Sequence, residues 1–249
     1  MRCDIFIKSW WNDLSFLSYA LRFLEKNWKE PESLIHVLCD EVCRHVTNQW
    51  RFSSKVRYYF CQPWPDGYSH AMTMKALADE FTDAAYILFF DSDIMLLEPA
   101  TRDGFMVGNR PVLLWVEQDQ HDAENQGSPW GRVQERVMKA RPSRHYVYLP
   151  TMYHHSTFAA MREYLVWLHR KPFFDIAYSG APFSPDNFSG HPISFCEHDA
   201  LGAYIYLKEA DRYEFRHVRD ANRCSTRQYH SWTQWNEKTQ NELEERLAQ

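Results

Sequence analysis

The sequence lacks long hydrophobic segments, and this absence bears on where the protein can reside. No apolar run approaches the roughly 20 residues that a membrane-spanning helix requires. The first residues also lack the basic and apolar segments of a signal peptide, because Cys3-Asp-Ile-Phe-Ile7 already has the pattern of a β-strand. We therefore predict no membrane segment and a cytoplasmic location.

Paired cysteine motifs are also missing. The six cysteines are Cys3, Cys39, Cys43, Cys61, Cys196 and Cys224, and none forms Cys-x-x-Cys. The pair Cys39-x3-Cys43 has no matching Cys or His pair to complete a zinc site, so the spacing predicts none. Scattered cysteines on or next to apolar segments favour reduced thiols.

The chain has no excess of positive charge. It carries 28 Lys and Arg against 33 Asp and Glu, a formal net charge of −5. This balance disfavours tight non-specific binding of nucleic acid, although a local basic groove remains an alternative. With 249 residues, 45% hydrophobic content and no repeat or linker, the sequence predicts one globular α/β domain.

Strand and helix patterns alternate along the chain, as is typical of α/β domains. Apolar positions recur at helical spacing in residues 14–28 and again in 68–81, where Lys75 lies near the middle. Strand patterns occupy residues 4–7, 34–38, 56–60, 86–90, 112–116, 146–149 and 213–218. The polar stretch 118–129 and the stretch 173–192, rich in Pro, Gly and aromatic residues, are predicted to be loops.

The most informative stretch is Tyr86-Ile-Leu-Phe-Phe-Asp91-Ser92-Asp93. Its apolar run indicates a buried strand, and ligands of open α/β sheets bind at the carboxyl ends of such strands. Two crowded carboxylates repel each other unless a cation compensates, and Mg²⁺ or Mn²⁺ with a substrate phosphate is the usual solution. The alternative is that Asp91 caps a turn and Asp93 faces solvent.

Together with the strand–helix–strand start, this motif resembles the glycosyltransferases of the GT-A fold. The similarity is most specific from Gly67-Tyr68 through Lys75-x-x-Ala78-Asp79 to Asp91-Ser92-Asp93, a pattern that resembles small bacterial and viral glycosyltransferase-like proteins. Residues 194–204 resemble, in divergent form, the acidic motif that such proteins carry at the head of a helix. The resemblance implies a single Rossmann-like domain over residues 1–249. Its predicted parts are a nucleotide-sugar-binding half (1–117), an acceptor-binding half (118–235) and a peripheral C-terminal helix (236–249).

The resemblance also implies roles for individual residues. In GT-A enzymes the Asp-x-Asp holds a divalent metal on the diphosphate of a nucleotide-sugar such as a UDP-sugar. Asp93 would therefore bind Mn²⁺ or Mg²⁺ directly, Asp91 would contact the ribose or the metal through water, and His230 would complete the metal shell. The residues implied in donor binding are Lys8, Ser9, Trp10, Asp40, Lys75, Asp91 and Ser92. For Lys75, an ion pair with Asp79 one turn later is an equal alternative.

The expected reaction moves a hexosyl or pentosyl group to a hydroxyl of an acceptor, for which a catalytic base is needed in inverting enzymes. Glu197 is the first candidate for this base and Asp199 the second; the alternative is that both only cap the helix that follows. The acceptor is expected to be a glycan, while a hydroxymethylated DNA base is disfavoured by the acidic charge.

Two other classes of protein compete with this interpretation. A phosphatase of the haloacid-dehalogenase type also uses a strand ending in Asp-x-Asp, but that motif should follow the first strand rather than lie at Asp91. A non-catalytic module that binds a nucleotide or sugar is the other alternative. Unused paired acids would destabilise such a module, which favours the enzyme.

Overall fold

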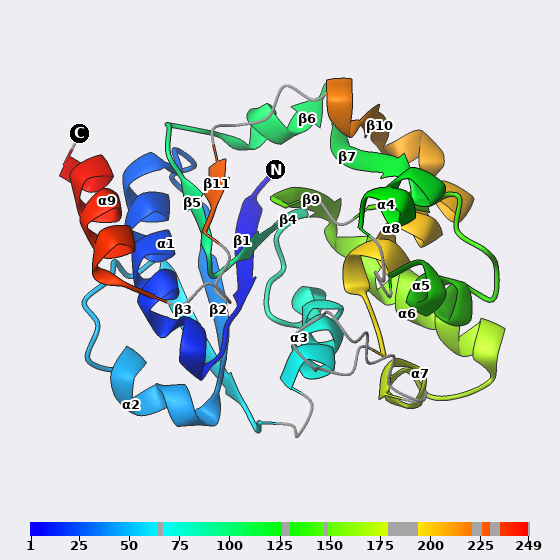
Figure 1. The fold of residues 1–249 in the computed structure, drawn as a ribbon, viewed down its shortest axis with the longest axis horizontal. Coiled ribbons are helices and arrows are strands. Elements are labelled where there is room, and N and C mark those ends of the chain that lie inside the picture. Colours follow the sequence, from blue (N-terminus) through cyan, green and yellow to red (C-terminus); the bar gives the residue numbers. More distant parts are fainter. Residues whose placement is uncertain are drawn as a thin grey trace.

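A mostly parallel sheet forms the centre of the molecule in the computed structural model (Figure 1). The structure describes residues 1–63, 67–125, 130–146, 149–178, 194–220, 226–229 and 235–248. The strands of the central sheet are β1 (Cys3–Lys8), β2 (Ile35–Asp40), β3 (Val56–Cys61), β4 (Tyr86–Asp91) and β9 (Thr151–His154). Their order is β3-β2-β1-β4-β9, with the first four parallel and β9 antiparallel to β4. The predicted α/β fold with a mostly parallel sheet is confirmed.

The apolar strands are continuous because side chains on both faces of the sheet are buried. Successive residues of a strand point to opposite faces. Ile5 and Ile7 therefore join one hydrophobic cluster, together with Leu88 of the neighbouring strand. Phe6 and Phe89 join the other. A strand flanked by two cores can carry few polar residues until it reaches the edge of the sheet.

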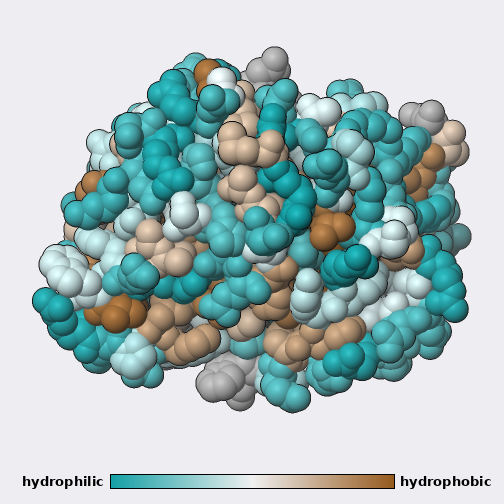
Figure 2. Space-filling view, turned by 180° about the vertical axis from the view of Figure 1, so that it is seen from behind, coloured by the Kyte–Doolittle hydropathy of each residue, from teal (hydrophilic) through white to brown (hydrophobic). Residues whose placement is uncertain are grey.

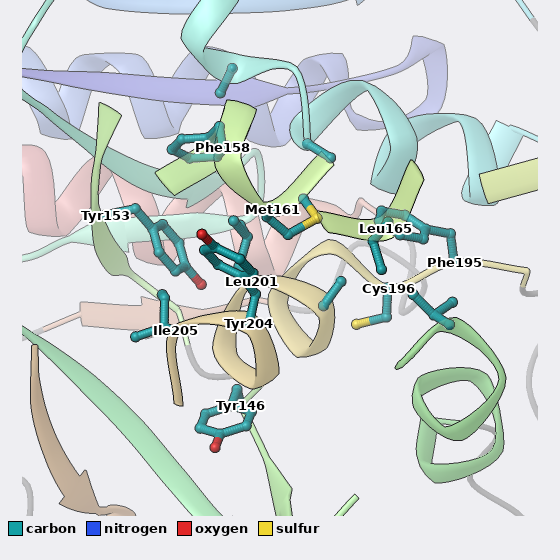
Figure 3. Packing of buried hydrophobic residues seen from close by; sticks show 14 of the residues in the cluster. Tyr146, Tyr153, Phe158, Met161, Leu165, Phe195, Cys196, Leu201, Tyr204 and Ile205 are labelled. Atoms are coloured by element: carbon teal, nitrogen blue, oxygen red, sulfur yellow. The ribbon is translucent and has the colours of Figure 1, made fainter. Parts of the chain in front are cut away.

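Helices cover both faces of the sheet. One face is covered by α1 (Leu14–Asn27), whose Leu14, Leu17, Leu21 and Leu24 form the predicted helical stripe and pack in the cluster of Ile5. On the other side lie α3 (Gly67–Lys75), α5 (Trp130–Met138), α6 (His155–His169), α7 (Phe173–Tyr178) and α8 (Glu197–Lys208) (Figure 1). Figure 3 shows this larger core, where α6 contributes Phe158, Met161 and Leu165 opposite Leu201 and Ile205 of α8.

Short strands and turns of helix surround this framework. A second sheet has the order β10-β7-β6, with β8 paired to β7. Its strands are β6 (Met106–Val107), β7 (Arg110–Glu117), β8 (Arg144–His145) and β10 (Glu214–His217). The short helices are α2 (Arg44–Thr47), η1 (Trp11–Asp13), η2 (Glu41–Cys43), η3 (Ala78–Glu80), η4 (Arg102–Phe105), η5 (Ala210–Arg212) and η6 (Val218–Asp220).

The C-terminal part of the chain returns to the first half. β11 (Thr226–Gln228) pairs antiparallel with β5 (Ile94–Leu96), the strand that directly follows Asp93. The helix α9 (Glu237–Ala248) lies beside α1 (Figure 1), where Leu243 is buried with Phe16 and Phe23. Arg22 of α1 forms an ion pair with Glu244 of α9 at 2.7 Å. The helices α1 and α9 are thus packed together.

Two local predictions were wrong. Residues 118–124 were expected in a loop but form the helix α4 (Gln118–Glu124), and residues 173–178 of the second predicted loop form α7. Asn125 is the cap residue after α4. The remainders of the two stretches, 126–129 and 179–192, lie outside the described residues. The strand predicted at 146–149 falls partly on residues 147 and 148, which lie outside the described residues. The next strand along the chain is β9, which begins at Thr151 and closes the edge of the central sheet.

The surface in Figure 2 is mainly hydrophilic, with hydrophobic residues in patches between the polar ones. Exposed large apolar side chains include Trp167 on α6 and Phe174 on α7. Within the described part of the chain, the helices are too short or too polar to cross a bilayer.

Candidate functional site

The carboxyl ends of four neighbouring parallel strands bring polar residues to one edge of the sheet. β1 ends at Lys8, β2 at Asp40, β3 at Cys61 and β4 at Asp91. The register places Lys8 beside Asp91 and Asp40 beside Cys61. Such an edge is where α/β proteins bind ligands, because the loops that follow the strands can diverge there. The sequence predictions that rested on strand ends therefore converge on one place.

Lys8 and Asp40 form a buried ion pair at this edge. The Lys8 ammonium donates a hydrogen bond to Asp40 Oδ1 at 2.8 Å and a second one to the carbonyl oxygen of Ser9 at 2.7 Å. The Lys8 side chain is only 1% exposed, whereas that of Asp40 is 14% exposed. A buried ammonium is stable only when it is paired, so Lys8 and Asp40 hold each other in position.

Lys75 bridges two carboxylates. Its ammonium lies 2.5 Å from Asp91 Oδ1 at the end of β4 and 3.2 Å from Glu197 Oε1 at the start of α8. The alternative partner, Asp79, pairs with Arg162 of α6 at 2.5 Å. One ammonium group thus joins α3 and β4, which are close in the sequence, to α8, which is far from both. Asp91 is the most accessible of the three, with 28% of its side chain exposed.

Glu197 is a carboxyl group in an almost dry environment. Its side chain is fully buried, and burial raises its pKa to about 7, although the charge of Lys75 opposes this rise. His198 Nε2 lies 3.3 Å from Glu197 Oε1, and His198 Nδ1 lies 2.9 Å from the hydroxyl of Tyr153. Burial, reinforced by Lys75, lowers the pKa of His198 well below its usual range, so this ring is neutral. Glu197 therefore changes protonation near neutral pH.

Asp199 lies in a different environment from Glu197. Its Oδ1 accepts a hydrogen bond from the backbone N–H of Tyr146 at 2.9 Å, and its Oδ2 lies 3.3 Å from His145 Nδ1. The ring of His145 stacks on that of His121, with 3.7 Å between their centroids. These contacts fix α8 to the segment around β8. The structure thus brings Glu197 to Lys75 and directs Asp199 away from it.

The other predicted donor and metal residues have separate surroundings. Asp93 is buried; its Oδ1 accepts a hydrogen bond from Gln228 Nε2 at 3.3 Å, and its carbonyl oxygen accepts one from the N–H of Tyr229 at 2.9 Å. The hydroxyl of Ser92 donates to Asp13 Oδ2 at 2.9 Å. His230, the next residue after Tyr229, lies outside the described residues. The segment that leads to it nevertheless contacts Asp93.

The residues of the loop after β1 differ in how far they are exposed to solvent. Ser9 is buried, whereas Trp10 is 41% and Trp11 is 47% exposed. The ring of Trp11 stacks on that of His45 in α2, with 5.5 Å between centroids. An exposed aromatic ring in the loop that follows Lys8 is suited to stacking on a flat ring.

A further group of residues was not predicted from the sequence. Asp40, Cys61 and His70 each present an atom able to bind a metal, and these atoms all lie within 4.8 Å of one another. The spacing in the sequence carries no metal-binding signature, because the three residues come from β2, β3 and α3. A possible signal was the position of Asp40 and Cys61 at consecutive strand ends.

The chain is similar in fold to the galactosyltransferase LgtC. The crystal structure of LgtC in complex with donor and acceptor sugar analogues has a TM-score of 0.55 and 12% sequence identity, covering 98% of this chain and 95% of that chain. A structure of an active-site mutant of LgtC has the same TM-score and identity, covering 97% and 95%. None of the family models and none of the curated proteins matches the sequence. At this low identity the likeness shows the fold, and it confirms the predicted GT-A fold.

Proposed function

We propose that this protein is a metal-dependent glycosyltransferase, which transfers a sugar from a nucleotide-diphosphate sugar to a hydroxyl of a glycan. The observation that carries the proposal is the meeting of Lys8, Asp40, Lys75, Asp91 and Glu197 at the carboxyl edge of a GT-A-type sheet. The phosphatase alternative is disfavoured, because its Asp-x-Asp would follow the first strand, whereas this one follows β4. LgtC, similar in fold, was crystallised with donor and acceptor sugar analogues, which supports the same pair of substrates here.

The donor would occupy the edge between β2 and β4. Asp40 can accept hydrogen bonds from a ribose or a nucleobase, while Trp10 and Trp11, which follow Lys8 in the sequence, offer exposed aromatic rings. Lys8 and Lys75 supply positive charge in a buried setting, where it interacts strongly with an anionic diphosphate. Both ammonium groups are paired with carboxylates in this structure, so a bound diphosphate would compete for them.

The residues at the end of β4 suit a divalent metal. Carboxylate oxygens of Asp91 and Asp93 are the donor type that Mg²⁺ and Mn²⁺ prefer. Because Lys75 already neutralises Asp91, Asp93 is the stronger candidate for direct ligation, with His230 from the following segment as a further ligand. When bound, the ion would neutralise charge on the departing diphosphate. We propose Mn²⁺ or Mg²⁺ for this site.

Glu197 is the proposed base. A base is most effective when its pKa is close to the working pH, and burial raises the pKa of Glu197 to about 7. Lys75 joins Glu197 to Asp91, so the proposed acceptor side and donor side share one ammonium. Asp199 is assigned a positioning role instead, because it holds Tyr146 and His145.

The proposal is tested by thermal shift with UDP-, GDP- and TDP-sugars, with and without Mn²⁺. A donor that binds the folded state raises the apparent melting temperature by mass action. Asp93→Ala should abolish the Mn²⁺-dependent part of that shift while the protein stays folded. Asp211→Ala, which removes an exposed acid on η5, is the control and should keep the full shift. Donor binding that resists both a chelator and Asp93→Ala, or no binding of any nucleotide-sugar, would contradict the proposal.

A further inference from the structure

Three side chains of different chemistry meet at the end of β2 and β3. Asp40 and Cys61 are partners in the strand register, and Cys61 Sγ lies 3.8 Å from Asp40 Oδ1. His70, on α3, completes the group, and one ligand atom from each residue lies within 4.8 Å of the others. Asp40 and Cys61 are partly exposed and His70 is buried, so the group is open on one side.

The combination of donor atoms is specific. A carboxylate oxygen, a thiol sulfur and an imidazole nitrogen suit Zn²⁺, whereas Mg²⁺ and Mn²⁺ prefer oxygen alone. Around tetrahedral zinc, ligand atoms bound at roughly 2.0–2.3 Å are about 3.3–3.8 Å apart. Spacings of up to 4.8 Å therefore require side-chain adjustments of about 1 Å, which rotamer changes can supply. Three protein ligands would leave a fourth position for water.

A neighbouring hydroxyl orients the histidine. His70 Nδ1 lies 2.8 Å from the hydroxyl of Tyr178 on α7, and the two rings are nearly parallel. Metal-binding histidines usually engage their second ring nitrogen with an oxygen in this way, which fixes the ring and its tautomer. With Nδ1 engaged by Tyr178, Nε2 is the nitrogen that would face a metal.

Lys8 is the cation already close to this group. It donates to Asp40 Oδ1, and because a carboxylate has two oxygens, a metal at Oδ2 leaves that ion pair in place. Burial raises the pKa of the Cys61 thiol, while the charge of Lys8 opposes the rise. Metal binding would replace the thiol proton, which would pass to solvent.

We propose that Asp40, Cys61 and His70 form a binding site for Zn²⁺ whose ligands differ from Asp91 and Asp93, the proposed ligands of Mn²⁺ or Mg²⁺ at the same edge of the sheet. Zinc bound at this site would occupy Asp40, which also belongs to the proposed donor site, so zinc would compete with the nucleotide. That consequence rests on the proposed function, whereas binding of the metal alone does not.

The test uses Co²⁺ as a spectroscopic substitute for Zn²⁺, with the purified full chain and no nucleotide. One equivalent of Co²⁺ should produce a near-ultraviolet thiolate-to-cobalt band and the visible bands of tetrahedral cobalt, and Zn²⁺ should remove both. Cys61→Ser should abolish the thiolate band and weaken Zn²⁺ binding roughly tenfold or more, as measured against a chromophoric chelator. Circular dichroism checks that the variant is folded; if it is not, His70→Gln takes its place and should weaken binding equally.

Two controls locate the metal. Cys43→Ser, which alters a different buried cysteine three residues from Asp40, should keep the band. Asp93→Ala, which removes the proposed Mn²⁺ ligand, should keep it as well. The proposal is overturned if no thiolate band forms, if the band survives Cys61→Ser, or if Asp93→Ala removes it. None of these outcomes depends on whether the protein transfers a sugar.

Discussion

Replacement of Glu197 by Gln should change how the stability of the protein depends on pH. In the folded state burial raises the pKa of Glu197 from its ordinary 4.5 to about 7. The unfolded chain releases this proton near pH 4.5, whereas the folded protein retains it until about pH 7. Between these values the folded state binds more protons than the unfolded state, so stability falls as pH rises. The amide side chain of the Glu197→Gln variant cannot ionise, and the variant should lose this component of the slope.

The size of the effect follows from the two pKa values. Each tenfold change in proton affinity corresponds to about 1.4 kcal/mol, so full ionisation of Glu197 destabilises the fold by roughly 3 kcal/mol. Lys75 also loses a partner in the variant, so the comparison uses the slope of each stability curve with pH rather than its height. The difference in unfolding free energy between variant and parent should therefore grow by roughly 3 kcal/mol in favour of the variant.

Urea unfolding followed by tryptophan fluorescence, at several values between about pH 5 and pH 8, measures this difference. Glu163→Gln, which alters an exposed carboxylate on α6, is the control and should follow the parent across the range. Parallel curves for the parent and Glu197→Gln would refute the reasoning, because they would show that Glu197 has the same proton affinity in the folded and unfolded states.

Two other predictions concern the packing of α8. Gly202→Ala should lower the unfolding free energy by about 1–3 kcal/mol, because an added Cβ would lie 2.3 Å from Cγ of the buried Tyr146 ring. Gly108→Ala, whose Cβ meets open space but whose φ of +59° disfavours alanine, should cost about 1 kcal/mol through backbone strain alone in the same urea titration. Asp199→Asn should lower the unfolding free energy by roughly 1–2 kcal/mol, since it removes the carboxylate that faces His145. Donor binding in the thermal-shift assay should stay unchanged. A large loss of turnover at unchanged stability would instead assign Asp199 to the chemistry.

The edge of the sheet could be predicted from the sequence because strand ends are local features. An apolar run that stops at Asp91, and another that stops before Asp40, are visible without tertiary information. The partner of Lys75 could not be chosen in this way. Asp79 is close in sequence, whereas Glu197 reaches Lys75 only through the packing of α8 against α3. The meeting of Cys61 with His70 likewise depends on tertiary contacts.

The helices α4 and α7 show why a stretch rich in polar or turn-forming residues can be mistaken for a loop. In α4, Gln118 donates to Asp122 at 2.7 Å and Gln120 donates to Glu124 at 2.6 Å, so side chains one turn apart support the helix. In α7, the buried residues Phe173, Ile176 and Ala177 have helical spacing. That signal was present in the sequence, but the Pro- and Gly-rich residues that follow obscured it.

The pairing of β11 with β5 has a consequence for protein synthesis. Gln228, which hydrogen-bonds to Asp93, is translated 135 residues after it. The strands β1 to β4 are complete once Asp91 has been added, so they exist well before β11 is synthesised. Until β11 arrives, β5 presents an unpaired edge next to Asp93, which is a place where another chain can add a strand. Synthesis of β11, rather than folding of the first half, would set the moment when the acidic edge is protected.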